Sequence, residues 1–507
     1  MRLLKNTAAN FISAFIGPVL AIVLTPFYIR HIGLEGYGLV GFFTALTMLL
    51  NVFCAAVGKV YLSRMSAMVA TQESAASSQS LYFVFRALYF LLGLVTAAGI
   101  AALSWWISHR WLKLATLGPE SAQVCILLIA VTIMIAFPTG VCVNTLFALQ
   151  DQVRANANSV GCLLLTNAAA ALLVYHYKSV VAYYAATTAG ALLGYFLMAH
   201  SARSGLCRAC SAAWPGIREA FQRSWAEAIG IARSSLALIW TETVGVIVTQ
   251  TDRLLITSLM PLSSLGIYNT GTSLARPLQL ACQPFLTAAY PNLCQLAQGE
   301  DGARRASRDA ARQQMIVFVI ACALCLPFCS IPETLLNLWL KNIEIARAAA
   351  PVVAIYAIGN ALLGIAGAPY NLAVAVDKTK YAAIMNSAAL VWYPLAGYFL
   401  ISRYDLIGAA ILWLLYCAMA AASTTFVAVV WIDRTYLSAR SILLAVAVLA
   451  GACAGGGLAR LIPDARVLEK LAAAGSASFV ILVAGLLVVI GWTNTITGMG
   501  SLLQKYK

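Results

Sequence analysis

Runs of about twenty mostly apolar residues recur along the whole 507-residue chain. A helix needs roughly 20 such residues to cross about 30 Å of hydrocarbon. Only 10% of the residues are charged, whereas about a quarter are charged in a typical soluble domain. The sequence therefore predicts an all-α polytopic membrane protein. Its fourteen predicted spans are residues 10–30, 37–58, 81–108, 120–148, 157–177, 179–201, 229–259, 264–296, 314–340, 346–372, 381–401, 405–432, 440–462 and 472–494.

The distribution of basic residues predicts the orientation of the chain. If the N-terminus lies inside and fourteen spans follow, the cytoplasmic segments hold more Lys and Arg than the outer segments. Because such an excess marks the cytoplasmic side, both termini are expected in the cytoplasm. The net charge of +15 lies largely in short loops without a nucleic-acid-binding module, so the expected partner is anionic lipid rather than nucleic acid.

Short turns in the first half of the chain have counterparts in the second half. FALQDQVRAN (147–156) is matched by AVAVDKTKYA (373–382) at an offset of 226 residues, and HYKSVVA (176–182) by RYDLIGA (403–409) at an offset of 227. A third match pairs GYGL with GIYN. Predicted spans one to six and seven to twelve are therefore two copies of one bundle, unless turn chemistry alone makes these segments alike.

The number of spans in each copy determines the symmetry. Six is an even number, so both copies enter the membrane from the same side. The repeat is then parallel, with a pseudo-two-fold axis along the membrane normal and a central cavity between the halves. We predict an N-terminal six-helix lobe (1–201), a cytoplasmic linker (202–228), a C-terminal six-helix lobe (229–432), and two additional helices with a cytoplasmic tail (433–507).

Two predicted spans carry a polar seam. At about 100° per residue, Ser235, Glu242, Thr249 and Arg253 fall near one line along span 229–259. A charge at the bilayer centre costs at least about 2.5 kcal/mol, so such side chains face a water-filled cavity or a partner. We expect both seams to line the space between the halves. The second seam, on span 264–296, consists of Asn269, Thr272, Arg276, Gln279, Gln283, Thr287 and Tyr290.

The charged members of these seams suggest two roles. Glu242 and Arg276 lie at similar depths, so an ion pair between them is geometrically possible. Such a pair either only holds two helices together, or Arg276 lines an anion path while Glu242 neutralises it or exchanges a coupling cation. Asp252 is the second candidate for coupling, although its place near the outer surface suits a side chain that simply reaches toward water.

The predicted cytoplasmic entrance is rich in basic residues. Lys59 and Arg64 follow the second span, whereas Arg86 and Arg233 lie inside apolar runs. Arginine binds phosphate through paired hydrogen bonds, so positive charge on three helices favours a phosphate-bearing substrate. Ordinary anchoring on the cytoplasmic side explains Lys59 and Arg64 nearly as well.

Enzymatic activity is not expected. A membrane-embedded polymerase or glycosyltransferase needs an acidic metal site or a catalytic base in a sizeable loop, and this chain has four His and no such loop. Its cysteines lack the second ligand pair or the His partner of a zinc site. We predict no catalytic residue, no metal and no cofactor.

Several segments together resemble the bacterial polysaccharide-type flippases, above all the O-antigen flippases. These proteins belong to the multidrug, oligosaccharidyl-lipid and polysaccharide exporter superfamily. The likeness covers most of the first twelve spans. It rests on the opening KNTAANFISAFIGPVLAIVLTPFYIRHIGLEGYGLVGFFTAL, on GKVYLSR, on TDRLLITSLMPLSSLGIYNTGTSL, and on the turns LQDQVRAN and VAVDKTKY.

The resemblance implies a V-shaped pair of six-helix lobes that opens alternately to the two sides of the bacterial inner membrane. The substrate would be an undecaprenyl-diphosphate-linked oligosaccharide, moved from the cytoplasmic to the periplasmic leaflet in exchange for a proton or sodium ion, with a polysaccharide polymerase as a candidate partner. The family's cationic cavity would correspond to Lys59, Arg64, Arg86, Arg233 and Arg276.

One departure from the family concerns coupling. A member driven by a cation in its first lobe would be expected to carry a carboxylate in the first span, and none occurs between Arg2 and His31. Coupling would then depend on Glu242 or Asp252. Two alternatives of the same fold remain, a multidrug exporter and a flippase for the peptidoglycan lipid precursor.

Overall fold

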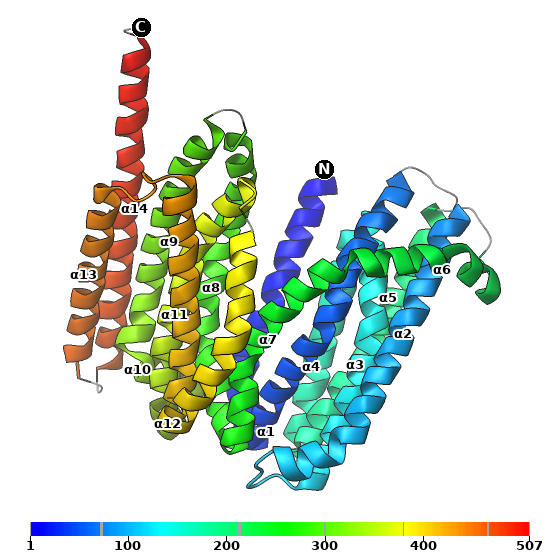
Figure 1. The fold of residues 1–507 in the computed structure, drawn as a ribbon. Coiled ribbons are helices and arrows are strands. Elements are labelled where there is room, and N and C mark those ends of the chain that lie inside the picture. Colours follow the sequence, from blue (N-terminus) through cyan, green and yellow to red (C-terminus); the bar gives the residue numbers. More distant parts are fainter. Residues whose placement is uncertain are drawn as a thin grey trace. The chain divides into compact units, whose positions relative to one another are not determined.

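The chain is built from helices, as the sequence predicts (Figure 1). It divides into two compact units, Met1–Gly266 and Ile267–Lys507. No strand occurs in the part of the chain that the structure describes. This computed structural model describes residues 2–70, 75–209, 214–298, 301–378, 380–463 and 466–505.

The first unit contains seven long helices and the start of an eighth. A short π-helical segment, Ile107–Trp111, follows the second helix. Residue Gly266, which ends this unit, lies one turn into α8. The helices are α1 (Arg2–Ala70), α2 (Ala75–Trp106), α3 (Pro119–Ala148), α4 (Gln152–Tyr177), α5 (Val180–Ala209), α6 (Ile217–Ser234) and α7 (Leu236–Leu259).

The second unit contains the rest of α8 and six further helices. A second π-helical segment, Val427–Ile432, follows α12. The compact units divide between Gly266 and Ile267. The predicted lobe boundaries at 201 and 229 stay predictions. The helices are α8 (Leu262–Leu296), α9 (Gly302–Ser330), α10 (Pro332–Leu340), α11 (Ile343–Ala375), α12 (Lys380–Phe426), α13 (Ala439–Leu461) and α14 (Val467–Lys505).

Within the described residues, ten helices are long and apolar enough to cross a membrane. Two of them, α1 and α12, each contain two predicted spans joined through a non-helical residue, Gly33 (φ 72°, ψ 172°) and Asp405 (φ 52°, ψ −134°). Helix α7 meets this criterion only together with α6, as a bent pair. Helix α8, which carries a polar seam, is not among the ten. The number fourteen therefore stays a prediction.

The turns of the predicted repeat share an uncommon backbone conformation. Gln150 (φ 57°) and Asp377 (φ 56°) both have a positive φ, and so do Lys178 (φ 48°) and Asp405 (φ 52°). Non-glycine residues seldom adopt positive φ. In each pair the two residues are 227 positions apart. Asp377 therefore corresponds to Gln150, whereas the offset of 226 had matched it with Asp151. This regularity favours the predicted duplication of the two bundles.

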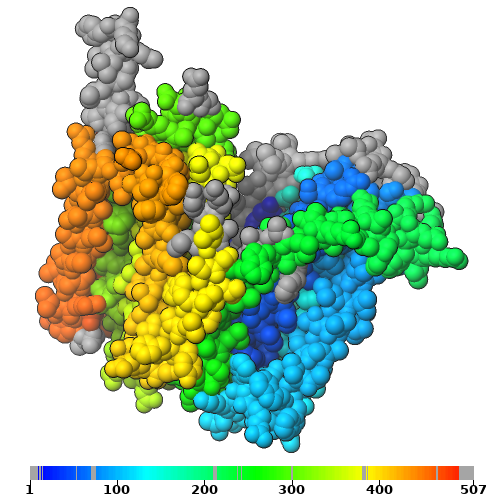
Figure 2. Space-filling model, in the orientation of Figure 1, coloured from blue at the N-terminus to red at the C-terminus, as the bar shows by residue number. Residues whose placement is uncertain are grey.

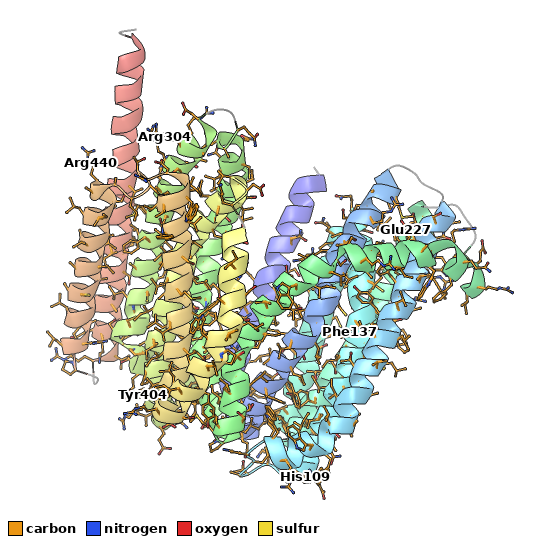
Figure 3. The ribbon with its side chains drawn as sticks, viewed as in Figure 1. His109, Phe137, Glu227, Arg304, Tyr404 and Arg440 are labelled. Carbon is orange, nitrogen blue, oxygen red and sulfur yellow. The ribbon has the colours of Figure 1, made fainter. Side chains whose placement is uncertain are left out.

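Labelled side chains mark the ends of each unit. In the second unit, Arg304 and Arg440 lie at one end and Tyr404 at the other (Figure 3). In the first unit, Glu227 and His109 lie at opposite ends. These positions agree with the predicted alternation of sides, whereas the cytoplasmic location of the termini stays a prediction.

The segment predicted as a linker contains helix α6. Its buried residues Ala220, Ser224, Ala228 and Ile231 follow i, i+4, i+8 and i+11 spacing, which is the pattern of an amphipathic helix. This face packs on α2, where the rings of Phe83 and Phe221 lie 6.5 Å apart. Helix α6 lies across one end of the first unit as an exposed ridge (Figures 1 and 2).

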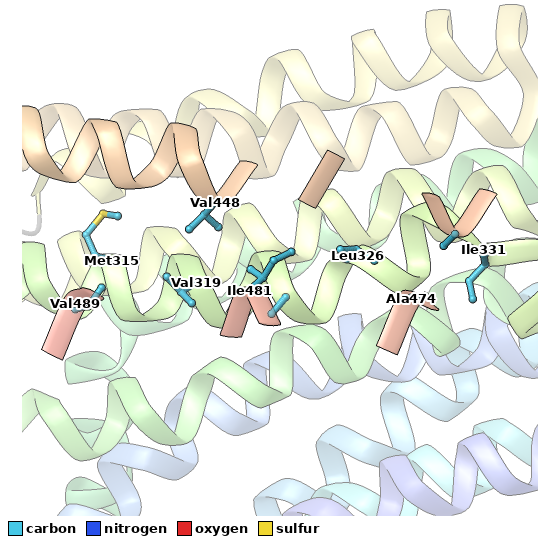
Figure 4. Close-up of a cluster of buried hydrophobic side chains, with 10 residues drawn as sticks. Met315, Val319, Leu326, Ile331, Val448, Ala474, Ile481 and Val489 are labelled. Atoms are coloured by element: carbon cyan, nitrogen blue, oxygen red, sulfur yellow. The ribbon is translucent and has the colours of Figure 1, made fainter. Parts of the chain in front are cut away.

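The two C-terminal helices pack against α9. The side chains of Met315, Val319 and Leu326 on α9 contact Val448 on α13 and Ile481 on α14 in one buried cluster (Figure 4). Small residues allow close approach, as is common between membrane helices. A Cβ on Gly485 of α14 would lie 2.6 Å from Val319. Spans thirteen and fourteen, which fall outside the predicted repeat, thus join the second unit through α9.

Helices α8 and α11 run parallel and are held by two asparagines. The Asn360 side-chain amide donates to the Ala275 carbonyl (3.0 Å), and that of Asn371 donates to the Leu286 carbonyl (3.5 Å). Both bonds join residues 85 apart, so equal steps along the two helices keep them in register. The indole of Trp413 on α12 donates to Asn360 (3.2 Å) and ties a third helix to this pair.

Candidate functional site

Three basic residues of the first unit lie on two neighbouring helices. Lys59 and Arg64 are on α1 and Arg86 is on α2. The rings of Tyr61 and Phe85 lie 4.7 Å apart, which brings these parts of α1 and α2 side by side. Arg86 is therefore beside the stretch of α1 that carries Lys59 and Arg64. The predicted shared depth of these cations and their binding of substrate stay proposals.

Lys59 forms an ion pair with Glu242 of α7. Its Nζ lies 2.6 Å from the Glu242 Oε1. The two side chains are 58% and 37% exposed, so the pair is accessible from outside the first unit's core. Sequence reasoning considered Arg276 as the partner of Glu242. The carboxylate instead contacts Lys59, which lies in the same unit.

Arg64 and Arg86 contact other groups. The Arg64 Nε donates to the Glu227 carboxylate on α6, and this bond ties the amphipathic helix to α1. The guanidinium of Arg86 lies 5.5 Å from the ring centre of Tyr82 and 5.9 Å from that of Phe83. Aromatic faces attract a cation, so these rings hold the Arg86 guanidinium without a carboxylate.

Arg233 belongs to α6 rather than to the predicted seventh span. Helix α6 ends at Ser234, and α7 continues at a bend of 53°. The buried Ser235 hydroxyl donates to the Ile231 carbonyl at this break (2.7 Å). A serine hydroxyl that bonds the preceding turn competes with helical hydrogen bonding and favours a bend. Arg233 is therefore exposed at the end of α6.

Asp252 lies in the interior of the first unit, and Arg253 beside it is partly buried. The Asp252 side chain is fully buried, so the expectation that it reaches toward water is wrong. Its Oδ1 accepts a hydrogen bond from the Arg253 backbone N–H (2.8 Å). The Arg253 guanidinium donates to the Gln250 side-chain oxygen (3.0 Å). A role in coupling remains a prediction for both Asp252 and Glu242.

The polar seam of α8 divides into two parts. Asn269 and Thr272 are buried, and Arg276 is exposed. Further along α8, Gln279, Gln283, Thr287 and Tyr290 line a cavity of about 510 Å³ together with α11 and α12.

Sequence reasoning missed a buried carboxylate, Glu35. Its oxygens accept hydrogen bonds from the backbone N–H groups of Ala115 (2.6 Å), Thr116 (2.6 Å) and Leu117 (3.0 Å), and from the Thr116 hydroxyl. A buried charge requires such partners. Glu35 thus anchors the loop between α2 and α3 to the turn within α1. In the sequence, only its position two residues after Gly33, in a predicted outer turn, could have indicated this role.

Comparison with known proteins identifies the family. The family model described as polysaccharide biosynthesis protein matches residues 3–297, which is more than half of the chain. The chain belongs to the polysaccharide biosynthesis protein family. A search of curated proteins finds no match.

Solved structures of two transporter types share the family member's fold. Lipid II flippase MurJ, in an inward closed conformation, has a TM-score of 0.70 at 12% identity and covers 97% of this chain and 100% of its own. A multidrug resistance MATE family transporter of the MOP superfamily, in an inward-facing conformation, has a TM-score of 0.65 at 14% identity, covering 84% and 98%. At such low identity these likenesses show a MOP-type transporter fold.

Proposed function

We propose that this family member is a flippase that moves an undecaprenyl-diphosphate-linked oligosaccharide from the cytoplasmic to the periplasmic leaflet of the bacterial inner membrane. The match to the polysaccharide biosynthesis family is the observation that carries this proposal. The fold of lipid II flippase MurJ supports a lipid-linked substrate. Both termini are cytoplasmic in this proposal, and alternating access moves the substrate without changing a covalent bond.

The cations of the first unit suit the charged part of this substrate. A diphosphate crossing bare hydrocarbon loses its hydration, which is prohibitive without compensating charge. Lys59, Arg64 and Arg86 supply positive charge on two neighbouring helices, and exposed Arg233 and Arg276 are further candidates. Arginine matches phosphate through paired hydrogen bonds. The isoprenoid tail stays in lipid while the headgroup crosses.

The Lys59–Glu242 pair suggests how binding and coupling are linked. Because the pair is half exposed, a diphosphate can compete with the Glu242 carboxylate for the Lys59 ammonium group. A displaced Glu242 is then free to bind a proton or a sodium ion. One carboxylate thus either neutralises the empty site or carries the coupling cation.

Complementation distinguishes this function from its two alternatives. We expect the gene to restore surface polysaccharide in a strain that lacks its own O-antigen translocase. A multidrug exporter would instead lower susceptibility to cationic drugs, and a peptidoglycan precursor flippase would support growth without the resident lipid II flippase. Either of these results without restored polysaccharide would contradict the proposal.

A further inference from the structure

The cavity of the second unit has both apolar and polar side chains in its lining and carries no charge. It measures about 510 Å³, within the roughly 300–1,000 Å³ of ligand pockets. None of the residues that line it is charged. The lining is instead rich in side-chain amides and phenols: Gln283, Asn371, Asn386, Tyr290, Tyr370 and Tyr416.

Three helices hold these groups in place. Gln283 and Tyr290 are two turns apart on α8, and Tyr370 and Asn371 are on α11. The Asn371 amide donates to the Leu286 carbonyl of α8 (3.5 Å), which leaves its side-chain oxygen as an acceptor. Gly367 of α11 faces the Leu286 side chain, so the two helices approach closely beside the cavity.

The lining disfavours a diphosphate, which needs cationic partners that this lining does not offer. It offers an organic cation aromatic faces but no carboxylate. Amides present donors and acceptors together, which suits hydroxyl groups that also donate and accept. Aromatic rings offer broad apolar faces with a polar tip, which suits the C–H face of a pyranose ring.

We propose that this cavity binds an uncharged sugar of the transported lipid-linked oligosaccharide, apart from the cations that bind its diphosphate. The inference rests on the proposed function and adds a division of labour to it. Cations of the first unit, together with Arg276 of the second, neutralise the diphosphate, and the cavity of the second unit recognises neutral hydroxyl groups. Selectivity among repeat units would then depend on α8, α11 and α12.

Binding measurements on the full chain in lipid nanodiscs test this inference. The first probe is undecaprenyl-diphosphate-linked oligosaccharide extracted from cells that make this chain's own polysaccharide, and the second is undecaprenyl diphosphate without sugar. The test variant is Gln283→Leu, which removes an exposed amide with little change in volume. The matched control is Gln295→Leu, an exposed glutamine on the same helix outside the cavity.

We expect Gln283→Leu to lower the affinity for the sugar-bearing lipid about tenfold, as for a lost hydrogen bond and its unpaired partner, and to leave the affinity for bare undecaprenyl diphosphate unchanged. Gln295→Leu should bind both lipids as the wild type does. An unchanged affinity of Gln283→Leu for the sugar-bearing lipid would overturn the inference, although wild-type binding would uphold the proposed function. If the wild-type protein binds neither lipid but binds ethidium, both proposals fail.

Discussion

At the scale of single residues, most of the charged side chains of the candidate site already have partners. Lys59 contacts Glu242, Arg64 contacts Glu227, and Arg86 lies against aromatic rings. Such contacts hold positive charge in place while the site is empty. In the proposed function, a diphosphate would bind by replacing a carboxylate or by adding to an aromatic contact, and not by meeting bare cations.

The Lys59–Glu242 pair gives a prediction with opposite signs for its two members. Glu242→Gln removes the competing charge, so the affinity for undecaprenyl diphosphate should rise by up to about fivefold, the equivalent of an exposed ion pair. Lys59→Ala should lower this affinity. Titration in nanodiscs measures both. Glu219→Gln, which removes the exposed partner of Arg223, is the control and should change nothing. Weaker binding by Glu242→Gln would contradict the competition.

Arg276 gives a second prediction. Replacing it with Ala should abolish export of the polymer while the protein stays in the membrane, because a cation of the anion path is lost. Arg276→Lys separates charge from guanidinium geometry, and full activity would mean that only the charge matters. Surface polysaccharide in the complemented strain is the measurement, and Arg304→Ala, at the end of the second unit, is the control. Unchanged export by Arg276→Ala would remove this residue from the mechanism.

At the scale of elements, glycines that face a neighbouring backbone determine how closely helices pack. A Cβ on Gly93 of α2 would lie 2.6 Å from the Met134 carbonyl oxygen of α3, whereas a Cβ on Gly99 of the same helix meets open space. We expect Gly93→Ala to destabilise the protein by about 1–3 kcal/mol through overpacking. Gly99→Ala should be neutral or stabilise it by up to about 1 kcal/mol, because alanine favours helix.

Thermal unfolding of the purified protein in one detergent compares these two variants. Equal melting temperatures would contradict this prediction, because they would mean that α2 and α3 can move apart at Gly93 without loss of stability. Because both substitutions are Gly→Ala in α2, a difference between them reports the contact with α3 and not helix propensity.

The sequence was sufficient to predict the class of fold and the side chains that share one face of a helix. Apolar runs predict the helices, and the spacing on α8 predicts that Gln279, Gln283 and Tyr290 share a face, as they do in the cavity. The helix α6 also has an amphipathic period, but its charged residues made it look like a loop. A search for helical periodicity within the interval 202–228 would have found it.

Partners across the fold could not be predicted. Glu242 and Lys59 are 183 residues apart, and Glu35 and Thr116 are 81 apart. Periodicity shows which residues share a face of one helix, but it does not show which faces of two helices meet. Depth alone placed Arg276 level with Glu242 and placed Lys59 at the end of its span, and it could not distinguish a buried Asp252 from an exposed one.

At the scale of the whole molecule, two kinds of chemistry belong to two compact units. The first unit carries the Lys59 and Arg64 ion pairs and the buried Asp252, and the second carries Arg276 and an uncharged cavity with amide and phenol groups in its lining. A lipid-linked oligosaccharide has the same division between a diphosphate and hydroxyl-rich sugars. This correspondence is the physical basis of the proposed function and of the sugar-binding inference.

Transport of labelled undecaprenyl-diphosphate-linked oligosaccharide in proteoliposomes tests the central claim most directly. The lipid is placed on both leaflets, and an impermeant glycosidase outside the vesicles reports the accessible fraction over time. We predict that the wild-type protein makes the inner-leaflet pool accessible, and that Arg276→Ala leaves it protected. An inner pool that stays as protected with the wild-type protein as in protein-free vesicles would contradict the account.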